Sequence, residues 1–255
     1  MTTATVRPRL IIFDVNETLS DLSPMAERFA EVGLPATLAA TWFAGVLRDG
    51  FALTVTGENP AFAELAKTSL RAHLGGRRGG GFGEAAGASN EAPAPDVEQA
   101  VANVMNGFME LPVHPDVVDG VRALADLGLR LVTLSNGSAG VARALLERNG
   151  IDEVFERLLT VEDAPAWKPA GSAYSYALET CEVSASEAML VAVHPWDIHG
   201  AHAAGLSTAW IDRSGAPYPS TMHPADLEVD SVTTLTARLS AWPADNRPLS
   251  LGGAS

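Results

Sequence analysis

LIIFDVNETL, residues 10–19, is an apolar run that stops at a carboxylate. Short, fully apolar runs that are rich in isoleucine are typical of buried strands. The strand predicted over residues 10–13 therefore has Asp14 at its carboxyl end. Ligands of open α/β sheets bind at this edge of the sheet. The stretch thus predicts a buried strand and a polar site directly after it.

Strand and helix patterns alternate along the second half of the chain. Apolar runs predict strands at residues 129–134, 154–159, 189–193 and 207–211, and helical patterns occupy residues 116–127, 139–149, 172–180 and 198–204. Such alternation predicts right-handed βαβ crossovers and a parallel sheet. We therefore expect an α/β fold with a Rossmann-like parallel sheet core.

The segment between the first strand and this alternating region has a helical pattern. It covers residues 24–30, 35–49, 60–74 and 97–109, and a Gly/Ala/Pro-rich stretch at 75–96 predicts a flexible loop. We expect an all-helical cap at 21–109, inserted after the first strand, and a core built from 1–20 and 110–240. Residues 241–255 carry no pattern and are expected to form a loose tail.

Charge and composition narrow the class of protein. The chain has 255 residues, is 47% hydrophobic and carries a formal net charge of −14. This charge argues against a nucleic-acid partner and against an anionic membrane surface, and its ordinary explanation is solubility. No apolar run approaches the roughly 18 residues of a membrane span. With no apolar leader and a single cysteine, Cys181, we expect a cytoplasmic protein.

Polar side chains follow several predicted strands. They are Asp14, Ser135, Asn136, Lys168 and Asp197. Taken singly, each has an ordinary explanation: a strand-end aspartate or a Ser-Asn pair often forms a turn, and a lone lysine is usually at the surface. All of them in this order, with a helical insert after the first, form a far more specific pattern.

Four motifs carry a family resemblance: FDVNETL at 13–19, TLSNGS at 133–138, WKPAGSAY at 167–174 and VAVHPWDIHGA at 191–201. They resemble the motifs of the haloacid dehalogenase superfamily of hydrolases, over roughly residues 9–240. Tyr174, the Trp196-Asp197 pair before Gly200, and AWIDR at 209–213 resemble its L-2-haloacid dehalogenase (type II) branch most closely.

The resemblance implies a covalent mechanism. Asp14 would be the nucleophile and would form an ester with the substrate, and Lys168 would keep it ionised and offset the charge of Asp197. Asp197 would orient Lys168 or the hydrolytic water, or hold Mg²⁺ together with Asp14 in a phosphatase. The alternative for Asp197 is a purely structural role, as an acid at the N-terminus of a helix, where the helix dipole favours a negative charge. The remaining implied site residues are Thr18, Ser135 and Tyr174 as hydrogen-bonding catalytic groups, and Asn136, Trp42 and Trp196 in substrate binding.

Asn16 bears on the leaving group. Phosphatases of the superfamily have an aspartate two residues after the nucleophile, which protonates the leaving oxygen. An asparagine cannot transfer that proton, and a halide needs none, so Asn16 favours carbon–halogen chemistry and a place near the substrate. The type II branch usually has an aromatic residue here, and a turn-forming residue without a chemical role is the alternative.

Two departures from the branch concern substrate binding. An arginine that directly follows a tryptophan grips the substrate carboxylate in that branch, whereas Phe43 follows Trp42 here. Arg48 lies five residues further along the same predicted helix and faces about 140° away. It would replace the missing arginine only if the cap is rotated, and a solvated arginine is the alternative. Trp42, Phe43 and Phe51 together predict an apolar mouth.

The second departure is His194. The branch usually has Ser-x-Asn before Trp-Asp, whereas this chain has Ala192, Val193, His194 and Pro195. An imidazole here could act as general base for ester hydrolysis, or pack at a strand end without a chemical role. His199 and His202 follow, but no cysteine or second acid stands beside them, so we expect no metal site.

Three functions are weighed. The first is a hydrolase that needs no cofactor and removes halide from a small 2-haloacid or a related compound through an ester on Asp14. The second is a Mg²⁺-dependent phosphatase of a small phosphorylated metabolite. The third is a catalytically weak binding protein, against which the retained Asp14, Lys168 and Asp197 argue. The branch resemblance also implies a homodimer through the cap.

Overall fold

The structure is a computed structural model that describes residues 7–76 and 96–242. The chain divides into two compact units: one combines the residues up to Asp21 with those from Pro112 onward, and the other is Leu22–Leu111. Most of the predicted loop at 75–96 and of the tail at 241–255 lies outside the described residues. Two details differ from expectation, because Gly75 is the last residue of a helix and Trp242 packs into the hydrophobic core.

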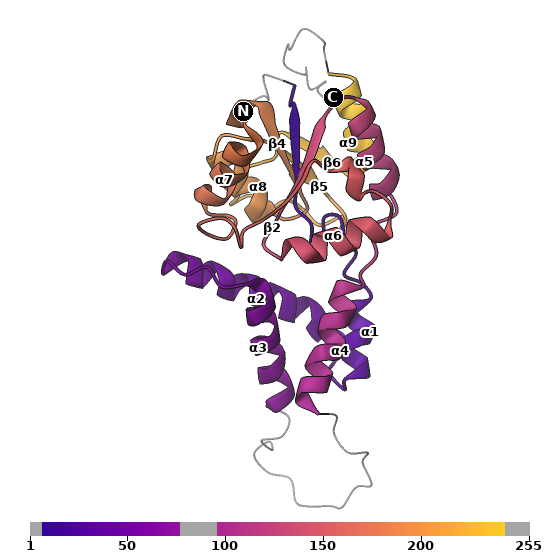
Figure 1. Cartoon of the computed structure of the whole chain (residues 1–255), viewed down its shortest axis with the longest axis vertical. Coiled ribbons are helices and arrows are strands. Elements are labelled where there is room, and N and C mark those ends of the chain that lie inside the picture. Colours follow the sequence, from indigo (N-terminus) through magenta and orange to yellow (C-terminus); the bar gives the residue numbers. More distant parts are fainter. Residues whose placement is uncertain (1–6, 77–95, 243–255) are drawn as a thin grey trace, which may run out of the picture. The chain divides into compact units, whose positions relative to one another are not determined.

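The first unit is built on a six-stranded parallel sheet (Figure 1). Its strands are β1 (Leu10–Phe13), β2 (Arg130–Ser135), β3 (Arg157–Thr160), β4 (Ala188–Ala192), β5 (Ser207–Ile211) and β6 (Leu227–Val229). They lie in the order β3-β2-β1-β4-β5-β6. The expected α/β, Rossmann-like fold is confirmed.

Helices cover both faces of this sheet (Figure 1). On one face, α5 (Val117–Asp126), α6 (Ala139–Arg148) and α9 (Val232–Ser240) bury their apolar side chains against those of the strands. On the other lie α7 (Gly171–Cys181) and α8 (Pro195–Ala203). Two short 3₁₀ turns complete this unit, Asp152–Val154 beside α5 and α6, and Ala185–Glu187 directly before β4. Strand β1 is buried over its whole length, as its uninterrupted apolar run predicts.

The site position follows from the strand order. From β1 the chain builds the sheet outward to β2 and β3, then crosses to β4 and continues to β5 and β6. The order therefore reverses between β1 and β4, and in open α/β sheets such a switch point is where ligands bind, beyond the carboxyl ends of the strands. Asp14 follows β1 and His194 lies just beyond β4, so both stand at this point.

Strand β6 and helix α9 have no counterpart in the sequence-based prediction. Strand β6 has only three residues, too few to show a period. Helix α9 is rich in β-branched residues, which have weak helix propensity. It forms because Ser231 caps its start, accepting a hydrogen bond from the Thr234 backbone N–H at 3.1 Å, and because α9 packs on α5, where Val232 closely approaches Gly120.

The described part of the second unit is all-helical: α1 (Met25–Glu31), α2 (Leu38–Val55), α3 (Phe62–Gly75) and α4 (Val97–Met109). Its core is an aromatic cluster of Phe29, Trp42, Phe43, Phe62 and Phe108. Helix α2 was expected to end near residue 49 but continues for two more turns. Gly50 is buried inside it, so packing outweighs the roughly 1 kcal/mol by which an interior glycine disfavours a helix.

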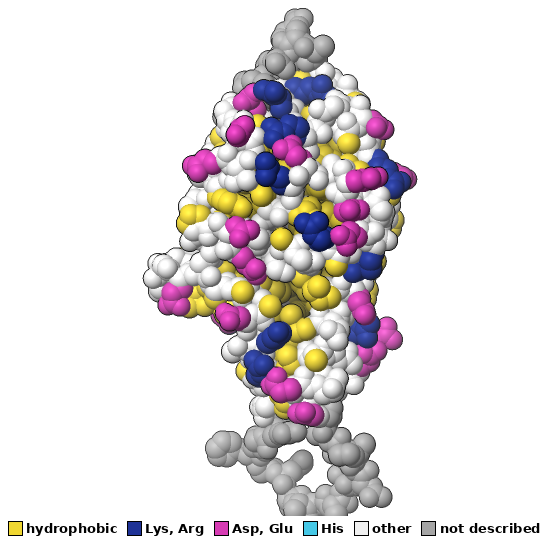
Figure 2. Space-filling view, in the orientation of Figure 1, with side chains coloured by type: hydrophobic (Ala, Val, Ile, Leu, Met, Phe, Trp, Pro, Cys, Tyr) yellow, Lys and Arg dark blue, Asp and Glu magenta, His cyan; other side chains and the backbone are white. Residues whose placement is uncertain are grey.

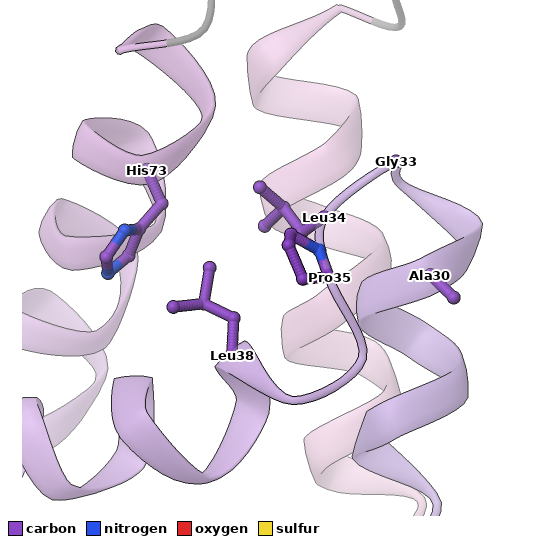
Figure 3. Close-up of a pocket in the computed structure, with 6 residues that line it drawn as sticks. All are labelled: Ala30, Gly33, Leu34, Pro35, Leu38 and His73. Atoms are coloured by element: carbon purple, nitrogen blue, oxygen red, sulfur yellow. The ribbon is translucent and has the colours of Figure 1, made fainter.

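An open hollow of about 660 Å³ lies within this helical unit (Figure 3). Its lining is apolar apart from one imidazole and consists of Ala30, Gly33, Leu34, Pro35, Leu38 and His73. Among the described residues that line it, none carries a carboxylate or a hydroxyl nucleophile. On the face drawn in Figure 2, acidic and basic side chains are interspersed.

Among the helices of the described residues, none is long and apolar enough to cross a membrane.

Candidate active site

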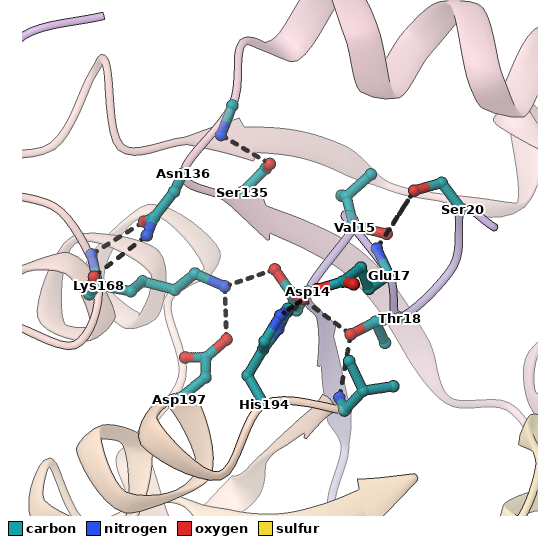
Figure 4. Close-up of polar contacts among 12 residues, drawn as sticks. Asp14, Val15, Glu17, Thr18, Ser20, Ser135, Asn136, Lys168, His194 and Asp197 are labelled. Carbon is teal, nitrogen blue, oxygen red and sulfur yellow. Dashed lines mark hydrogen bonds and ion pairs between the residues drawn. The ribbon is translucent and has the colours of Figure 1, made fainter. Parts of the chain in front are cut away.

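Asp14 is the centre of a buried polar cluster at the end of β1 (Figure 4). Its Oδ1 accepts a hydrogen bond from Lys168 Nζ at 2.9 Å. Its Oδ2 accepts one from Thr18 Oγ1 at 2.7 Å and lies 3.2 Å from His194 Nδ1. Burial raises the pKa of Asp14, but the charges and hydrogen bonds of Lys168 and His194 outweigh it and hold that pKa well below its usual range. Asp14 is therefore ionised, as a carboxylate nucleophile must be.

Lys168 joins two buried carboxylates. Its Nζ is 2.9 Å from Asp14 Oδ1 and 2.6 Å from Asp197 Oδ2, and its side chain is fully buried. Burial lowers the pKa of Lys168, but the charges of Asp14 and Asp197 raise it above its usual value. The ammonium group therefore stays charged and holds the two acids together.

Asp197 is also bound by Tyr174. The Tyr174 hydroxyl donates to Asp197 Oδ1 at 2.6 Å, so both oxygens of this carboxylate accept a hydrogen bond. Burial raises the pKa of Asp197, and the charge of Asp14 adds to this, while Lys168 opposes it. A carboxylate with a raised pKa is a stronger base than an ordinary one and is better suited to accept a proton. The contacts of Asp197 thus go beyond those of a simple helix N-terminal acid.

Asn136 and Ser135 take supporting positions. Asn136 was expected to contact the substrate, but its amide is bound to the backbone of Lys168. Asn136 Nδ2 donates to the Lys168 carbonyl at 3.1 Å, and the Lys168 N–H donates to Oδ1 at 3.0 Å. Ser135 Oγ accepts from the Gly137 N–H at 2.9 Å. These bonds fix the loop after β2 and the backbone that carries Lys168.

Thr18 is a donor with a fixed direction. Its Oγ1 accepts a hydrogen bond from the Val193 N–H at 3.1 Å, so its own proton is left for Asp14 Oδ2. Arg213 holds the same loop from outside: its Nη2 donates to the Thr18 carbonyl at 2.9 Å and its Nη1 to Asp116 Oδ1 at 2.8 Å. Arg213, in the AWIDR stretch, is a positioning residue that the sequence reasoning did not identify.

The contacts of His194 do not favour a general base, which is one of the two roles considered for it from the sequence. Its Nδ1 is 3.2 Å from Asp14 Oδ2, and its Nε2 is 2.9 Å from Glu17 Oε2. Burial lowers the pKa of His194, but the hydrogen bonds and charges of Asp14 and Glu17 outweigh it and raise that pKa to about 9. At neutral pH the ring is thus protonated and has no free lone pair with which to accept a proton from water.

Glu17 was also missed from the sequence. It lies in the FDVNETL motif three residues after Asp14, and the signal that could have identified it is this second acid in the loop after β1. Its backbone is left-handed, with φ of 63°, a conformation that non-glycine residues seldom adopt. Ser20 Oγ, which accepts from the Glu17 N–H at 3.3 Å, and His114 Nε2, which is 3.0 Å from the Glu17 carbonyl, hold it there.

Asn16 and Trp196 stand beside this cluster. Asn16 is buried, and a Cβ placed on Gly137 would lie 3.4 Å from Asn16 Nδ2 and 3.3 Å from Ser135 Oγ. The Asn16 amide thus lies near the loop after β2. The Trp196 ring is 5.0 Å from the His194 ring and 5.9 Å from Lys168 Nζ. Both of these residues belong to the same unit as Asp14.

The three site residues predicted in the helical insert belong to the other unit. Trp42 Nε1 donates to the Ala66 carbonyl at 3.2 Å. Phe43 stacks near Phe108 within the aromatic cluster. The Arg48 side chain is 76% exposed and pairs with Asp49 at 2.7 Å. Arg48 therefore has the contacts of a surface arginine, and this arrangement does not support it as a replacement for the carboxylate-binding arginine.

The contacts do not fit a Mg²⁺ ion between Asp14 and Asp197. All four carboxylate oxygens of this pair accept hydrogen bonds or ion pairs, and the ammonium group of Lys168 stands between the two acids. Mg²⁺ prefers an octahedral shell of oxygen ligands, and here a fixed cation stands in its place. Across residues 7–76 and 96–242, no group of three or more His, Cys, Asp or Glu could hold a metal ion.

Comparison with known proteins agrees with this geometry. Residues 8–205 match the haloacid dehalogenase-like hydrolase family. The chain belongs to this family. It is therefore an enzyme of the hydrolase class, and the superfamily resemblance seen in its four motifs is confirmed.

The relatives of this hydrolase support the predicted branch. Haloacetate dehalogenase H-2 of Moraxella sp. (strain B) is 32% identical over 55% of the chain, and the match spans 64% of that protein, just under two thirds. (S)-2-haloacid dehalogenase 1 of Pseudomonas sp. (strain CBS-3) is 25% identical over 89% of the chain and 94% of that protein. A crystal structure of a dehalogenase with intermediate complex has a TM-score of 0.79 and 25% identity, covering 91% of the chain and 97% of that structure.

Proposed function

We propose that this hydrolase removes halide from a small 2-haloacid or a closely related halogenated compound, by way of a covalent ester on Asp14. The observation that carries the proposal is the buried Asp14 carboxylate, which Lys168 Nζ holds at 2.9 Å. The two dehalogenase relatives support the substrate class.

In the first step, a carboxylate oxygen of Asp14 attacks the carbon that bears the halogen. A carbon–oxygen bond forms, the carbon–halogen bond breaks, and the halide leaves with the electron pair. No proton is needed, which agrees with Asn16 at the position where a phosphatase requires an acid. Asp14 supplies the negative charge, so a cofactor has no role in this step.

In the second step, water attacks the Asp14 carboxyl carbon and the ester is hydrolysed. Asp197 is the proton acceptor for this water, since burial raises its pKa and it lies 2.6 Å from Lys168 Nζ. The intermediate then expels the product alkoxide, which carries away an original Asp14 oxygen. Lys168 lies between Asp197 and that oxygen and passes the Asp197 proton to the alkoxide, and the second proton of the water is lost as Asp14 returns to the carboxylate.

Halide release, measured by ion chromatography with EDTA present, tests the proposal. The panel holds both 2-chloropropionate enantiomers, chloroacetate, fluoroacetate and 2-chloropropionamide. We expect release that disappears in Asp14→Asn, while the exposed Asp119→Asn retains it. A single turnover in ¹⁸O-labelled water should place the label in Asp14 and none in the product. Release that needs added Mg²⁺, or label in the product alone, contradicts the mechanism.

We also propose that Leu22–Leu111 is the helical cap that the sequence predicts. The insert leaves the core seven residues after Asp14, and both of its ends are tied there: the Asp21 N–H donates to the Pro112 carbonyl at 2.8 Å and the His114 N–H to the Leu19 carbonyl at 2.9 Å. A homodimer and a cytoplasmic location remain expectations from the sequence. Analytical ultracentrifugation of the full chain tests the first, and cell fractionation the second.

A further inference from the structure

His194 lies between two acids that can only accept hydrogen bonds. Its Nδ1 faces Asp14 Oδ2 at 3.2 Å and its Nε2 faces Glu17 Oε2 at 2.9 Å. A neutral imidazole has one N–H and can satisfy one of these contacts. Both contacts are satisfied when both nitrogens carry protons, so the geometry requires an imidazolium. His194 is also the N-cap of α8, where the helix dipole disfavours a cation, so the two carboxylates must stabilise the charge.

The two oxygens of Asp14 have different surroundings. Oδ2 accepts from Thr18 and faces His194, whereas Oδ1 accepts from Lys168. An oxygen that holds fewer donors is the better nucleophile, so Oδ1 is the atom that attacks the substrate. Oδ2 then becomes the carbonyl oxygen of the ester, and negative charge collects on it when water adds to the carboxyl carbon.

We propose that His194 is a catalytic residue of the ester-hydrolysis step, forming with Thr18 an oxyanion hole at Asp14 Oδ2, and that Glu17 is the positioning residue that keeps His194 charged. This inference rests on the proposed function, since it needs an ester on Asp14. Donors that are already in place where charge develops stabilise the transition state without reorganisation.

Charge balance through the reaction explains why Glu17 is needed. In the free enzyme, Lys168 and His194 share the negative charge of Asp14. Alkylation removes that charge, but Lys168 keeps Asp197 at 2.6 Å and His194 keeps Glu17 at 2.9 Å. The ester intermediate therefore contains two separate ion pairs. His194 stays protonated at the moment when Oδ2 becomes an oxyanion, because Glu17 remains as its partner.

The step balances as follows. The oxygen of water bonds to the Asp14 carboxyl carbon, its proton goes to Asp197, and the carbonyl electron pair moves to Oδ2, where Thr18 and His194 hold it. Collapse re-forms the carbonyl and breaks the bond between the carboxyl carbon and Oδ1. The proton from Asp197 reaches the departing alkoxide, and the remaining water proton is lost as Asp14 returns to the carboxylate. His194 donates hydrogen bonds throughout and transfers no proton.

Rapid-quench kinetics separate the two steps. The initial halide burst reports alkylation, and intact-mass spectrometry of the quenched enzyme reports the ester. In His194→Ala, we expect a full burst of one halide per site, an ester that accumulates, and hydrolysis slowed by roughly 100-fold, as for other lost oxyanion donors. His194→Asn restores a neutral donor and should recover part of the rate. If His194→Ala loses both the halide burst and turnover and accumulates no ester, the proposal is wrong.

Glu17→Gln tests the positioning role with little risk to folding, because the Glu17 side chain is 41% exposed. In this variant we expect an unchanged halide burst and slower ester hydrolysis. The pH above which hydrolysis slows (the alkaline limb of its pH profile) should move to lower pH, because His194 loses its proton more easily without Glu17. The exposed Glu153→Gln removes the same charge elsewhere and should leave the limb in place. If the alkaline limb does not move in Glu17→Gln, Glu17 does not keep His194 charged. Failure of the proposed function is distinct, since the wild-type enzyme would then give neither halide nor an Asp14 ester.

Discussion

At the scale of single residues, the site depends on one ammonium group that serves two acids. Asp14 and Asp197 are both buried, and Lys168 Nζ contacts each of them. A buried carboxylate that loses its cation leaves an uncompensated charge in a region of low dielectric, and this costs more than the pair gains. Lys168 therefore matters for stability as well as for chemistry.

Lys168→Met should abolish halide release and lower the free energy of unfolding by about 3–5 kcal/mol, the usual effect of breaking a buried ion pair. Urea unfolding followed by circular dichroism measures the second effect. The exposed Lys67→Met is the matched control and should change neither quantity. Adding Asp197→Asn to Lys168→Met should recover part of the lost stability, since it removes one of the two stranded charges. A double variant less stable than the single one would contradict this account.

His194 gives stability its own pH dependence. Its pKa is raised to about 9 by Asp14 and Glu17, the two carboxylates that face it, from the usual value of about 6.5. A group whose pKa is higher in the folded state than in the unfolded state contributes its full stabilisation below its unfolded-state pKa. That contribution is lost as the pH rises through its folded-state pKa. The stability difference between wild type and His194→Asn should thus shrink between about pH 6.5 and 9. Denaturant unfolding at intervals across this range measures it, and a constant difference would show that the ring does not titrate there.

At the scale of elements, close contact between α8 and the segment around Pro169 holds the cluster together. A Cβ on Gly200 would lie 2.6 Å from the Tyr174 hydroxyl and 2.9 Å from the Pro169 carbonyl oxygen. Glycine is needed there because α8 carries Asp197 and must approach both Tyr174 and Lys168. The helix contact thus sets the distances within the site.

Gly200→Ala should destabilise the protein by about 1–3 kcal/mol, because the added methyl group overpacks this contact. It should also slow turnover by displacing Tyr174 from Asp197. Gly171→Ala, at the start of α7, meets no atom within 4 Å and should be neutral or slightly stabilising. Thermal unfolding and halide release on both variants measure the two effects. Equal behaviour of the two alanines would show that the close approach is not needed.

At the scale of the whole molecule, the net charge of −14 would act on the proposed haloacid substrate, which is itself an anion. A field of this sign repels a haloacid at long range and leaves a neutral halogenated amide unaffected. Salt screens the field, since the Debye length falls from about 30 Å at 0.01 M to about 10 Å at 0.1 M ionic strength.

For 2-chloropropionate, kcat/KM should therefore rise by roughly two- to tenfold when potassium sulfate is added across this range. The value for 2-chloropropionamide serves as the control and should stay constant. Sulfate replaces chloride in this measurement because chloride is the product. A fall in kcat/KM for the acid would instead indicate a locally positive entrance to the site.

The sequence by itself determined the sheet, the helical insert and most of the charged cluster, because each depends on local pattern. An apolar run marks a buried strand wherever it occurs, and polar residues after such runs meet at one edge of a parallel sheet. Asp14, Lys168 and Asp197 were predicted in this way, Thr18 and Tyr174 were implied by the family resemblance, and all five lie together. The family that their motifs resemble is the family that the chain matches.

The tertiary structure alone decided what depends on distance and on shared partners. Asn136 binds the Lys168 backbone, and Arg48 pairs with Asp49 at the surface, because a side chain's partner is not fixed by its place in a motif. His194 was expected to be a general base or to pack at a strand end, and the two acids that face it favour a cation. Protonation follows from the sum of burial and nearby charge, which exists only once β1 and β4 bring residues 180 positions apart to within 3.2 Å.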